Sequence, residues 1–164
     1  MALLLTSLST PIGTLNLIAD GEVLLGANLS SFRALKAGLD PIYDSFEIKE
    51  VSKIPVISPL IKDYFDGDVR AIDAIKVSQP GGSFSQSAWK AMRRVKAGKV
   101  ISYADLAKSA GSPKAVRAAG SACAKNAIVI VVPCHRIVKT GGALGNYAYG
   151  LNKKEWLLGH EGLA

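Results

Sequence analysis

The hydrophobic pattern of this chain changes at the stretch 79–83, Gln-Pro-Gly-Gly-Ser, whose composition is typical of a linker. Before it, short apolar runs such as 14–19 are separated by hairpin-type turns, which predicts antiparallel strands. After it, apolar residues recur at the 3.6-residue spacing of helices. We therefore predict an N-terminal α/β domain over residues 1–78 and a mainly α C-terminal domain over residues 79–164.

The predicted N-terminal domain combines a small antiparallel sheet with helices. A short helix is expected over 31–38, and a second one begins at Ser58-Pro59 because proline is favoured at the first helical position. This part of the chain contains neither Cys nor His, and no motif in it can be assigned a chemistry, so we interpret it as a scaffold. The predicted strands are 3–5, 14–19, 23–27, 48–51 and 72–77.

The predicted C-terminal domain begins with a helix capped by Ser83 that ends near Ala97-Gly98. Two shorter helices follow, over 103–108 and 113–125, and the turn between them contains Gly111. Two short helices joined by such a turn indicate a helix-turn-helix. After a loop rich in glycine and tyrosine at 139–150, a last helix is predicted over 153–158, capped by Asn152.

Charge is divided unevenly along the chain. Residues 1–80 contain seven Lys and Arg against ten Asp and Glu, whereas residues 81–164 contain thirteen against three, a net charge of +10. A basic half of this kind is expected to meet a polyanion. The alternative is a solvated basic face without a partner.

The second helix of the pair has an unusual composition for one that reads DNA sequence. Over 114–122 it offers small side chains and, apart from Lys114, the single long polar residue Arg117. Small side chains allow a close approach to a duplex, even over its narrow minor groove, and predict binding through phosphates without sequence preference. Alternatively, an Ala-rich helix is simply one that packs tightly in a core.

Cys134, His135 and Arg136 stand in consecutive positions behind an apolar run. A thiolate is a strong nucleophile, and a neighbouring imidazole can take its proton directly or through a water, so Cys134 is the candidate nucleophile. Taken alone, a Cys-His pair is as often structural as catalytic. Cys123, the other cysteine, is predicted to be a core residue.

Two free thiols fit a reducing compartment better than a disulfide, which points to the cytoplasm. The apolar start of the chain has no basic region before it, so we predict neither a signal peptide nor a membrane span. With histidine only at 135 and 160, no zinc-ligand spacing exists, and we predict no metal and no cofactor.

Several motifs together resemble one family, the O6-alkylguanine-DNA alkyltransferases. The resemblance spans nearly the whole chain and is carried by Pro-Cys-His-Arg-Ile-Val at 133–138, Arg-Ala-Ala-Gly at 117–120, Gly-Asn-Tyr at 145–147, Leu-Leu-Gly-His-Glu-Gly at 157–162, and Ser-Thr-Pro-Ile-Gly at 9–13. It implies a ribonuclease-H-like α/β N-terminal domain and a C-terminal domain with a winged helix-turn-helix.

The resemblance also implies an activity and roles for named residues. Cys134 would take the alkyl group from guanine O6 in one irreversible turnover. O4-alkylthymine is expected to be a second substrate. His135 would deprotonate Cys134 through a water, and Glu161 would hold the imidazole. Tyr103 would steer the target phosphate and supply a proton to the departing guanine, while Asn126 would act as a hinge.

Further residues are implied to contact DNA or the flipped base. Arg117 would fill the stack where the base leaves, and duplex DNA would be bound through its minor groove by a monomer. Contacts to DNA are expected from Tyr103, Ser112, Ala115 and Ala118. The base pocket is expected to be lined by Gly145, Tyr147, Ala148 and Tyr149.

Two other functions compete with this interpretation. A non-catalytic relative would bind the lesion and signal to another repair pathway, but such proteins replace the nucleophile, and Cys134 is present. A Cys-His hydrolase would have no use for the basic half or the helix-turn-helix. The resemblance therefore favours a self-alkylating repair transferase found in the cytoplasm, or in the nucleus of a eukaryote.

Overall fold

The computed structural model describes residues 1–163, which form two compact units. Unit 1 comprises Met1–Pro80 together with Ala127–Val131, and unit 2 comprises the rest of the described chain. The coarse prediction of an α/β protein is confirmed, since a sheet and helices are both present. The predicted division into two domains between residues 78 and 79 stays a prediction, because a compact unit is not by itself a domain that folds independently.

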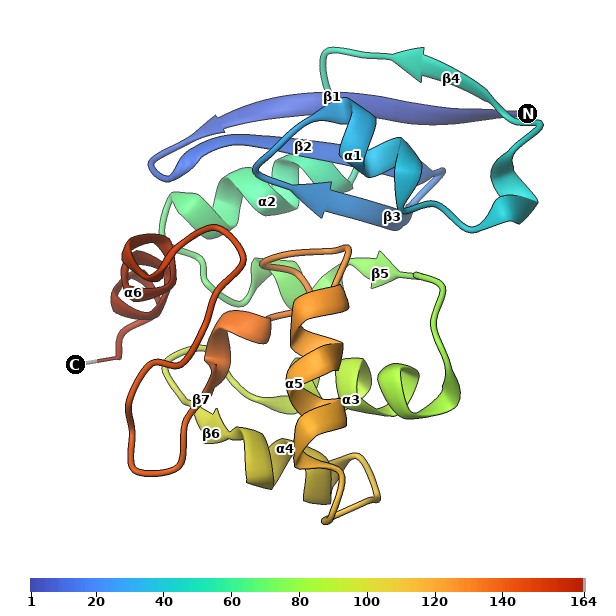
Figure 1. The fold of residues 1–164 in the computed structure, drawn as a ribbon. Helices are drawn as coiled ribbons and strands as arrows, with labels where there is room; N and C mark the ends of the chain where they lie inside the picture. The colour runs from blue at the N-terminus through green and yellow to red at the C-terminus, as the bar shows by residue number, and fades with distance from the viewer. Residues whose placement is uncertain (164) are drawn as a thin grey trace. The chain divides into compact units, whose positions relative to one another are not determined.

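Unit 1 is built on a five-stranded sheet with the order β4-β1-β2-β3-β5 (Figure 1). The hairpin turns at Pro11-Ile12 and Asp20-Gly21-Glu22 join the first three strands into an antiparallel meander. The antiparallel strands predicted within residues 3–30 are confirmed, but the sheet as a whole is mixed, because β4 pairs parallel with β1, and β5 pairs parallel with β3. The strands are β1 (Ala2–Thr10), β2 (Gly13–Asp20), β3 (Val23–Asn28), β4 (Glu47–Glu50) and β5 (Lys76–Val77).

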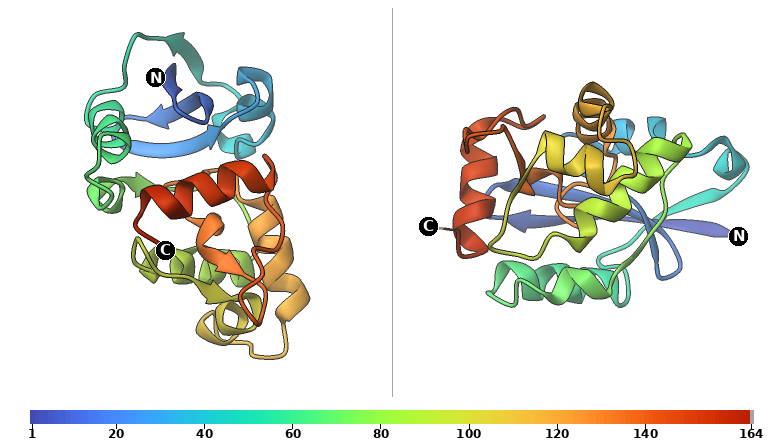
Figure 2. Two further views of the ribbon diagram at one scale, coloured as in Figure 1. Left: turned by 90° about the vertical axis from the view of Figure 1, so that its left-hand side faces the viewer. Right: turned by 90° about the horizontal axis from the view of Figure 1, so that it is seen from below.

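Helices lie on opposite sides of this sheet, as the views in Figures 1 and 2 show. The short helix α1 (Phe32–Ala37) is capped by the Ser31 side chain and buries Leu35. On the other side, α2 (Ile57–Phe65) buries apolar residues at helical spacing. Burial of both sheet faces explains why β2 and β3 are almost continuously apolar. The cluster under α1 consists of Leu3, Leu5, Ile18, Leu25 and Leu35.

A segment from late in the chain completes unit 1. In Ala127–Val131, the carbonyl of Ala127 accepts from Ala27 N at 2.9 Å, and Val129 N donates to Ala27 O at 3.1 Å. The amide of Ala127 also donates to Gln79 Oε1 at 2.8 Å. The apolar run that leads to Cys134 is therefore held by hydrogen bonds on β3.

Unit 2 packs three helices against one another and adds a fourth after the long loop. The indole Nε1 of Trp89 on the first of them donates to Ala122 O on the third, at 2.9 Å. A two-stranded parallel sheet pairs Ile101 with Ile137. The elements are α3 (Ser83–Arg94), β6 (Ile101–Ser102), α4 (Tyr103–Ser109), α5 (Val116–Lys125), the 3-10 turn η3 (Cys134–Arg136), β7 (Ile137–Val138) and α6 (Leu151–His160).

Some element boundaries differ from those predicted. Most of 72–77 is not a strand, because Ala71–Ala74 forms the 3-10 turn η2 and only Lys76–Val77 pairs with β3; a further 3-10 turn, η1, covers Pro41–Tyr43. α5 begins at Val116 instead of residue 113, since the amide of Ala115 closes a turn on Ser112 O.

The caps of three helices also differ. Gly82 precedes α3 where Ser83 was expected, and α2 begins at Ile57, one residue before Ser58-Pro59. Gly150, with a φ of 102°, is the N-cap of α6 and lies two residues before the predicted cap, Asn152. Only glycine adopts that φ without strain, which is why the helix starts there.

Gly81 and Gly82 allow a matched test of packing at the start of unit 2. A Cβ on Gly81 would lie 2.6 Å from the Trp89 ring, whereas a Cβ on Gly82 would meet nothing within 4 Å. Because Trp89 is buried and held by its hydrogen bond, we expect Gly81→Ala to lower the free energy of unfolding by about 1–3 kcal/mol. Gly82→Ala should change it by about 0.5 kcal/mol or less. Urea unfolding measures both, and equal effects would contradict the packing.

Candidate active site

Cys134 lies at the start of η3, where two tight turns follow one another. Its amide donates to Val132 O at 2.9 Å across Pro133, and the amide of Arg136 donates to Pro133 O at 3.0 Å. This backbone directs the three successive side chains of 134–136 to different places. Cys134 is 7% exposed, and His135 and Arg136 are buried.

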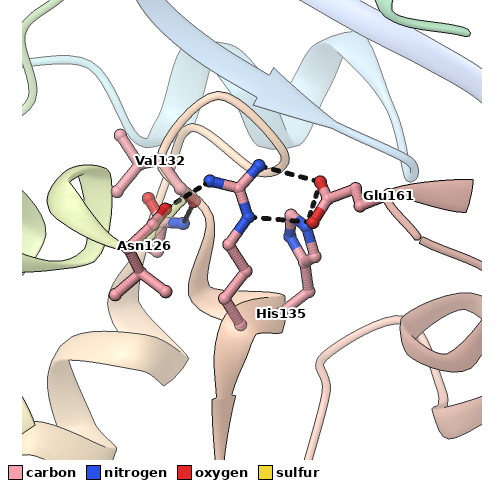
Figure 3. A network of polar contacts seen from close by, with 6 residues as sticks. Asn126, Val132, His135 and Glu161 are labelled. Atoms are coloured by element: carbon pink, nitrogen blue, oxygen red, sulfur yellow. Dashed lines mark hydrogen bonds and ion pairs between the residues drawn. The ribbon is translucent and has the colours of Figure 1, made fainter. Parts of the chain in front are cut away.

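A single carboxylate, that of Glu161, binds both residues that follow Cys134, and Figure 3 shows it beside His135. Glu161 Oε2 lies 2.8 Å from His135 Nε2 and accepts from Arg136 Nη2 at 2.9 Å. The other oxygen, Oε1, accepts from Arg136 Nε at 2.8 Å. Arg136 Nη1 donates to Val95 O at 2.7 Å. The guanidinium therefore grips the carboxylate with two parallel hydrogen bonds, the strongest geometry for such a pair.

The protonation states of this network follow from its contacts. Burial alone would raise the pKa of Glu161, but the hydrogen bonds from His135 and Arg136 lower the pKa to about 2. Burial lowers the pKa of His135 below its usual value, although Glu161 opposes this. The carboxylate is thus charged and the imidazole neutral at pH 7. A charged carboxylate accepts hydrogen bonds only, so His135 Nε2 carries the proton.

The other ring nitrogen of His135 is consequently a free acceptor. Nδ1 is buried and has no hydrogen-bond partner within residues 1–163. An imidazole with Nε2–H held by a carboxylate and an open Nδ1 is the arrangement in which histidine takes a proton from a nucleophile. Burial raises the pKa of Cys134, so its thiol needs such a base.

Asn126 connects the end of α5 with the turn before Cys134. It is the residue after Lys125, the last residue of α5, and its Nδ2 donates to Val132 O at 2.7 Å. Asn126 also counters the effect of burial on Cys134 by lowering that pKa. The side chain of Asn126 therefore joins the residues on either side of the segment 127–131 by one hydrogen bond.

A pocket of about 650 Å³ opens beside Cys134. It is formed by α5, Tyr103 at the start of α4, and the loop 139–150. Two exposed cationic residues, Arg117 and Lys139, lie on its wall. The lining residues are Tyr103, Val116, Arg117, Gly120, Ser121, Cys123, Ala124, Cys134, Lys139, Asn146, Tyr147 and Ala148.

Of the nine residues predicted for the base pocket or for DNA contact, four line this pocket. Tyr103, Arg117, Tyr147 and Ala148 line the pocket with Cys134. Ser112 and Ala115 precede α5 and are half-buried, and Ala118 lies in its first turn and is exposed.

Gly145 and Tyr149 are not among the lining residues of the pocket, but each contacts a residue that is. A Cβ on Gly145 would lie 2.9 Å from the Tyr103 hydroxyl, so glycine lets Tyr103 occupy its place. Tyr149 packs edge-to-face on Tyr147, with ring centroids 5.9 Å apart.

Cys123 differs from the prediction of a core position. It is half-buried and lines the same pocket as Cys134. Burial raises its pKa to about 12, so it stays a thiol at neutral pH. An Ala-rich helix has no polar face to mark its buried side, which is why its sequence did not reveal where this residue points.

Sequence reasoning missed Arg136, Lys139 and Lys154. Arg136 stood in the quoted motif without a role, although an arginine in an apolar run needs a buried acceptor. The signal for Lys154 was its spacing, since the apolar residues Leu157 and Leu158, three and four residues later, lie on the same face of a helix. Lys139 had no signal, because a lysine in a loop is usually solvated.

Known proteins resemble this chain over nearly its whole length. The family model of the 6-O-methylguanine DNA methyltransferase DNA-binding domain matches residues 83–163. A methylated-DNA–protein-cysteine methyltransferase of Salmonella typhimurium is 36% identical over 166 residues, which cover 99% of this chain and 97% of the relative. One of Methanosarcina acetivorans is 35% identical and covers 93% and 94%, respectively.

The chain belongs to the methylated-DNA–protein-cysteine methyltransferase family. This confirms the resemblance found in the sequence. A solved structure of the Mycobacterium tuberculosis O6-methylguanine methyltransferase is similar over 97% of this chain and 92% of its own, with a TM-score of 0.76 at 29% identity. A structure titled Mycobacterium tuberculosis OGT in complex with DNA gives a TM-score of 0.78 at 28% identity, over 96% and 92%.

Neither a metal-binding group of side chains nor a membrane-spanning helix is present in the described chain. Within residues 1–163, no three His, Cys, Asp or Glu side chains are grouped so that they could hold a metal ion. No helix among these residues is long and apolar enough to cross a membrane.

The low pKa of Glu161 predicts how stability depends on pH. Because folding lowers that pKa from 4.5 to about 2, the network contributes its full stability above pH 4.5 and loses it as pH falls towards 2. We expect the free energy of unfolding to drop by roughly 3 kcal/mol across this window. Urea unfolding at a series of pH values measures the drop.

Two variants assign this drop to the buried network. Glu161→Gln should flatten the dependence between pH 4.5 and 2. Asp66→Asn changes an exposed carboxylate paired with Lys62 on the surface and should keep the wild-type slope. An unchanged slope in Glu161→Gln would mean that the network does not carry the effect.

Proposed function

We propose that this chain repairs DNA by moving the alkyl group of O6-alkylguanine irreversibly onto the sulfur of Cys134. One observation carries the proposal: Cys134 lies on the wall of an open pocket, and the next residue, His135, is held by Glu161 with its Nδ1 without a hydrogen-bond partner in the described chain. The names of the relatives, methylated-DNA–protein-cysteine methyltransferases, support this activity.

The transfer is a single displacement at the alkyl carbon. His135 Nδ1 receives the thiol proton through a bridging water, and the sulfur of Cys134 attacks the carbon bound to guanine O6. The S–C bond forms, the C–O bond breaks, and its electron pair stays with the guanine. Tyr103, whose pKa burial raises, keeps its hydroxyl proton at pH 7 and donates it to the departing base. A thioether has no easy route back, so each molecule acts once.

The target base has to leave the helix to reach this sulfur. Cys134 is only 7% exposed, at a pocket wall that a stacked base cannot enter. Arg117, exposed at the pocket, is the residue we propose to fill the gap in the stack. Tyr147 and Ala148 enclose the base, with Gly145 and Tyr149 supporting them from behind.

The duplex is proposed to lie along α5. The basic charge of residues 81–164, the exposed small side chain of Ala118 and the half-buried Ser112 and Ala115 support binding of the minor groove through phosphates. The solved complex of the Mycobacterium tuberculosis protein with DNA supports a DNA partner. In this proposal the protein binds as a monomer and also accepts O4-alkylthymine.

Finer features of the fold belong to the same proposal. Helices α4 and α5 and the turn between them are the proposed helix-turn-helix, with the β6–β7 pair and loop 139–150 as its wing. The antiparallel meander of unit 1, flanked by parallel strands and helices, supports a ribonuclease-H-like domain. Cytoplasmic location stays a prediction from the two thiols.

The competing functions are disfavoured by the site. A non-catalytic lesion-binding protein needs no nucleophile, whereas Cys134 has a neutral imidazole beside it and a carboxylate that orients that imidazole. A Cys-His hydrolase has no use for the exposed Arg117 on the pocket wall or for the net charge of +10 over residues 81–164.

Mass spectrometry tests the proposal with two matched cysteine variants. Incubation with duplex DNA containing O6-methylguanine should add the mass of one CH₂ group to the peptide that holds Cys134, at one methyl per protein. Cys134→Ala should remove the transfer, while Cys123→Ala, in the same pocket but with a pKa of about 12, should keep it. Methyl loss from DNA in Cys134→Ala, or repeated turnover in the wild type, would end the proposal.

A further inference from the structure

Lys154 is a buried cation that the proposed mechanism does not use. Its side chain is in the first turn of α6, and the residue is 0% exposed. The ammonium donates to Ile137 O at 2.6 Å and to Asn146 O at 3.1 Å. No carboxylate lies within ion-pair distance of it in residues 1–163.

This placement is unfavourable for stability alone. A charge without a counter-ion loses its hydration on burial, and two carbonyl dipoles replace only part of it. A cation in the first turn of α6 also opposes the positive end of the helix dipole. A methionine would fill similar space without either penalty.

One acceptor of Lys154, Asn146 of loop 139–150, lines the pocket, and the other, Ile137, lies directly after the turn that carries Cys134. One ammonium therefore ties the loop that closes the pocket to the strand that follows the nucleophile. The ammonium of Lys154 has three N–H groups, and the described chain supplies acceptors for two of them.

The charges around Cys134 leave Lys154 unbalanced. Arg136 is neutralised by Glu161, and the imidazole of His135 is neutral. The phenols and the second thiol become anions only at high pH. The titratable groups near Cys134 or its imidazole are Tyr103, Cys123, His135, Tyr147, Lys154 and the Arg136–Glu161 pair, and the exposed cations Arg117 and Lys139 line the same pocket.

We propose that Lys154 is a positioning residue for alkyl transfer, which holds the pocket loop against β7 and supplies the fixed positive charge that favours the thiolate of Cys134. The proposal rests on the proposed function in that Cys134 is the acceptor. Burial raises the pKa of Cys134 and lowers that of Lys154, and each group opposes this for the other, since Lys154 lowers the pKa of Cys134 and the Cys134 thiolate raises that of Lys154. The counter-ion of Lys154 thus forms only when the reactive thiolate forms.

The test follows the reactivity of a single thiol without DNA. In a Cys123→Ala background, Cys134 is the only cysteine, and its rate of alkylation by iodoacetamide is measured from pH 6 to pH 10. Lys154→Met should move the midpoint of this profile upwards by about one pH unit, which slows the reaction about tenfold at pH 7. Lys154→Arg keeps a positive charge and should remain closer to wild type.

Lys153→Met is the matched control, because it removes a neighbouring, partly exposed cation from the same helix. It should leave the profile where it is. If Lys154→Met does not fold, Lys154→Gln replaces it, since it removes the charge and keeps hydrogen-bond donors. A profile that stays in place or moves to lower pH in the folded neutral variant would overturn the proposal.

The outcome can be separated from that of the proposed function. If methyl transfer from DNA fails in the wild type while the iodoacetamide profile shifts in Lys154→Met, the proposed substrate is wrong and the role of Lys154 stands. If transfer succeeds and the profile does not shift, only the role of Lys154 is wrong.

Discussion

The buried ion pair between Arg136 and Glu161 is the interaction on which the chemistry of this site depends. Both oxygens of the carboxylate are committed, and one of them also holds His135 Nε2. Removing either partner would leave a buried charge alone, a loss of about 3–5 kcal/mol in comparable pairs. The pair fixes which nitrogen of His135 carries the proton, because the charged carboxylate accepts from Nε2–H.

The same pair links distant parts of unit 2. Arg136 also donates to Val95 O at the end of α3. Gly98, with a φ of 85°, turns the chain so closely past Glu161 that a Cβ there would lie 3.0 Å from the Glu161 carbonyl oxygen. The end of α3, the turn η3 and the end of α6 therefore meet at one carboxylate, and the position of Cys134 is set by the same contacts that set its base.

A second constraint acts on the backbone before Cys134. Ile130 has a φ of 72°, which a β-branched residue adopts only under strain. The amide of Val131 closes a three-residue turn on Val129 O at 2.8 Å around it. This strained turn lies in the segment held on β3, and Asn126 clips its two ends together through Val132 O. Side-chain and main-chain hydrogen bonds thus both hold the approach to the nucleophile.

The chemistry of this site was largely predictable because its main residues are adjacent in the sequence. Cys134 and His135 form one motif, and the hairpin turns in the first thirty residues mark β2 and β3 closely, whereas the first strand was predicted over 3–5 and runs over Ala2–Thr10. Because a motif gives both the residue types and their spacing, the sequence alone was enough to predict Cys134 and His135 as site residues.

What escaped prediction depends on contacts between distant residues. The parallel pairing of β4 and β5 follows from where the chain returns after each helix, which alternation along a strand does not reveal. The side of α5 that carries Cys123 is hidden by its uniform alanine content. That Glu161 serves Arg136 as well as His135 is visible only when the end of α6 reaches η3.

The protonation state of His135 tests this account most directly. Nitrogen-15 NMR of the imidazole from pH 8 to pH 5, assigned by comparison with a His160→Gln variant, reports both the tautomer and the pKa. The account predicts a neutral ring with the proton on Nε2 and a pKa below 6.5. A proton on Nδ1, or a pKa above 6.5, would contradict it.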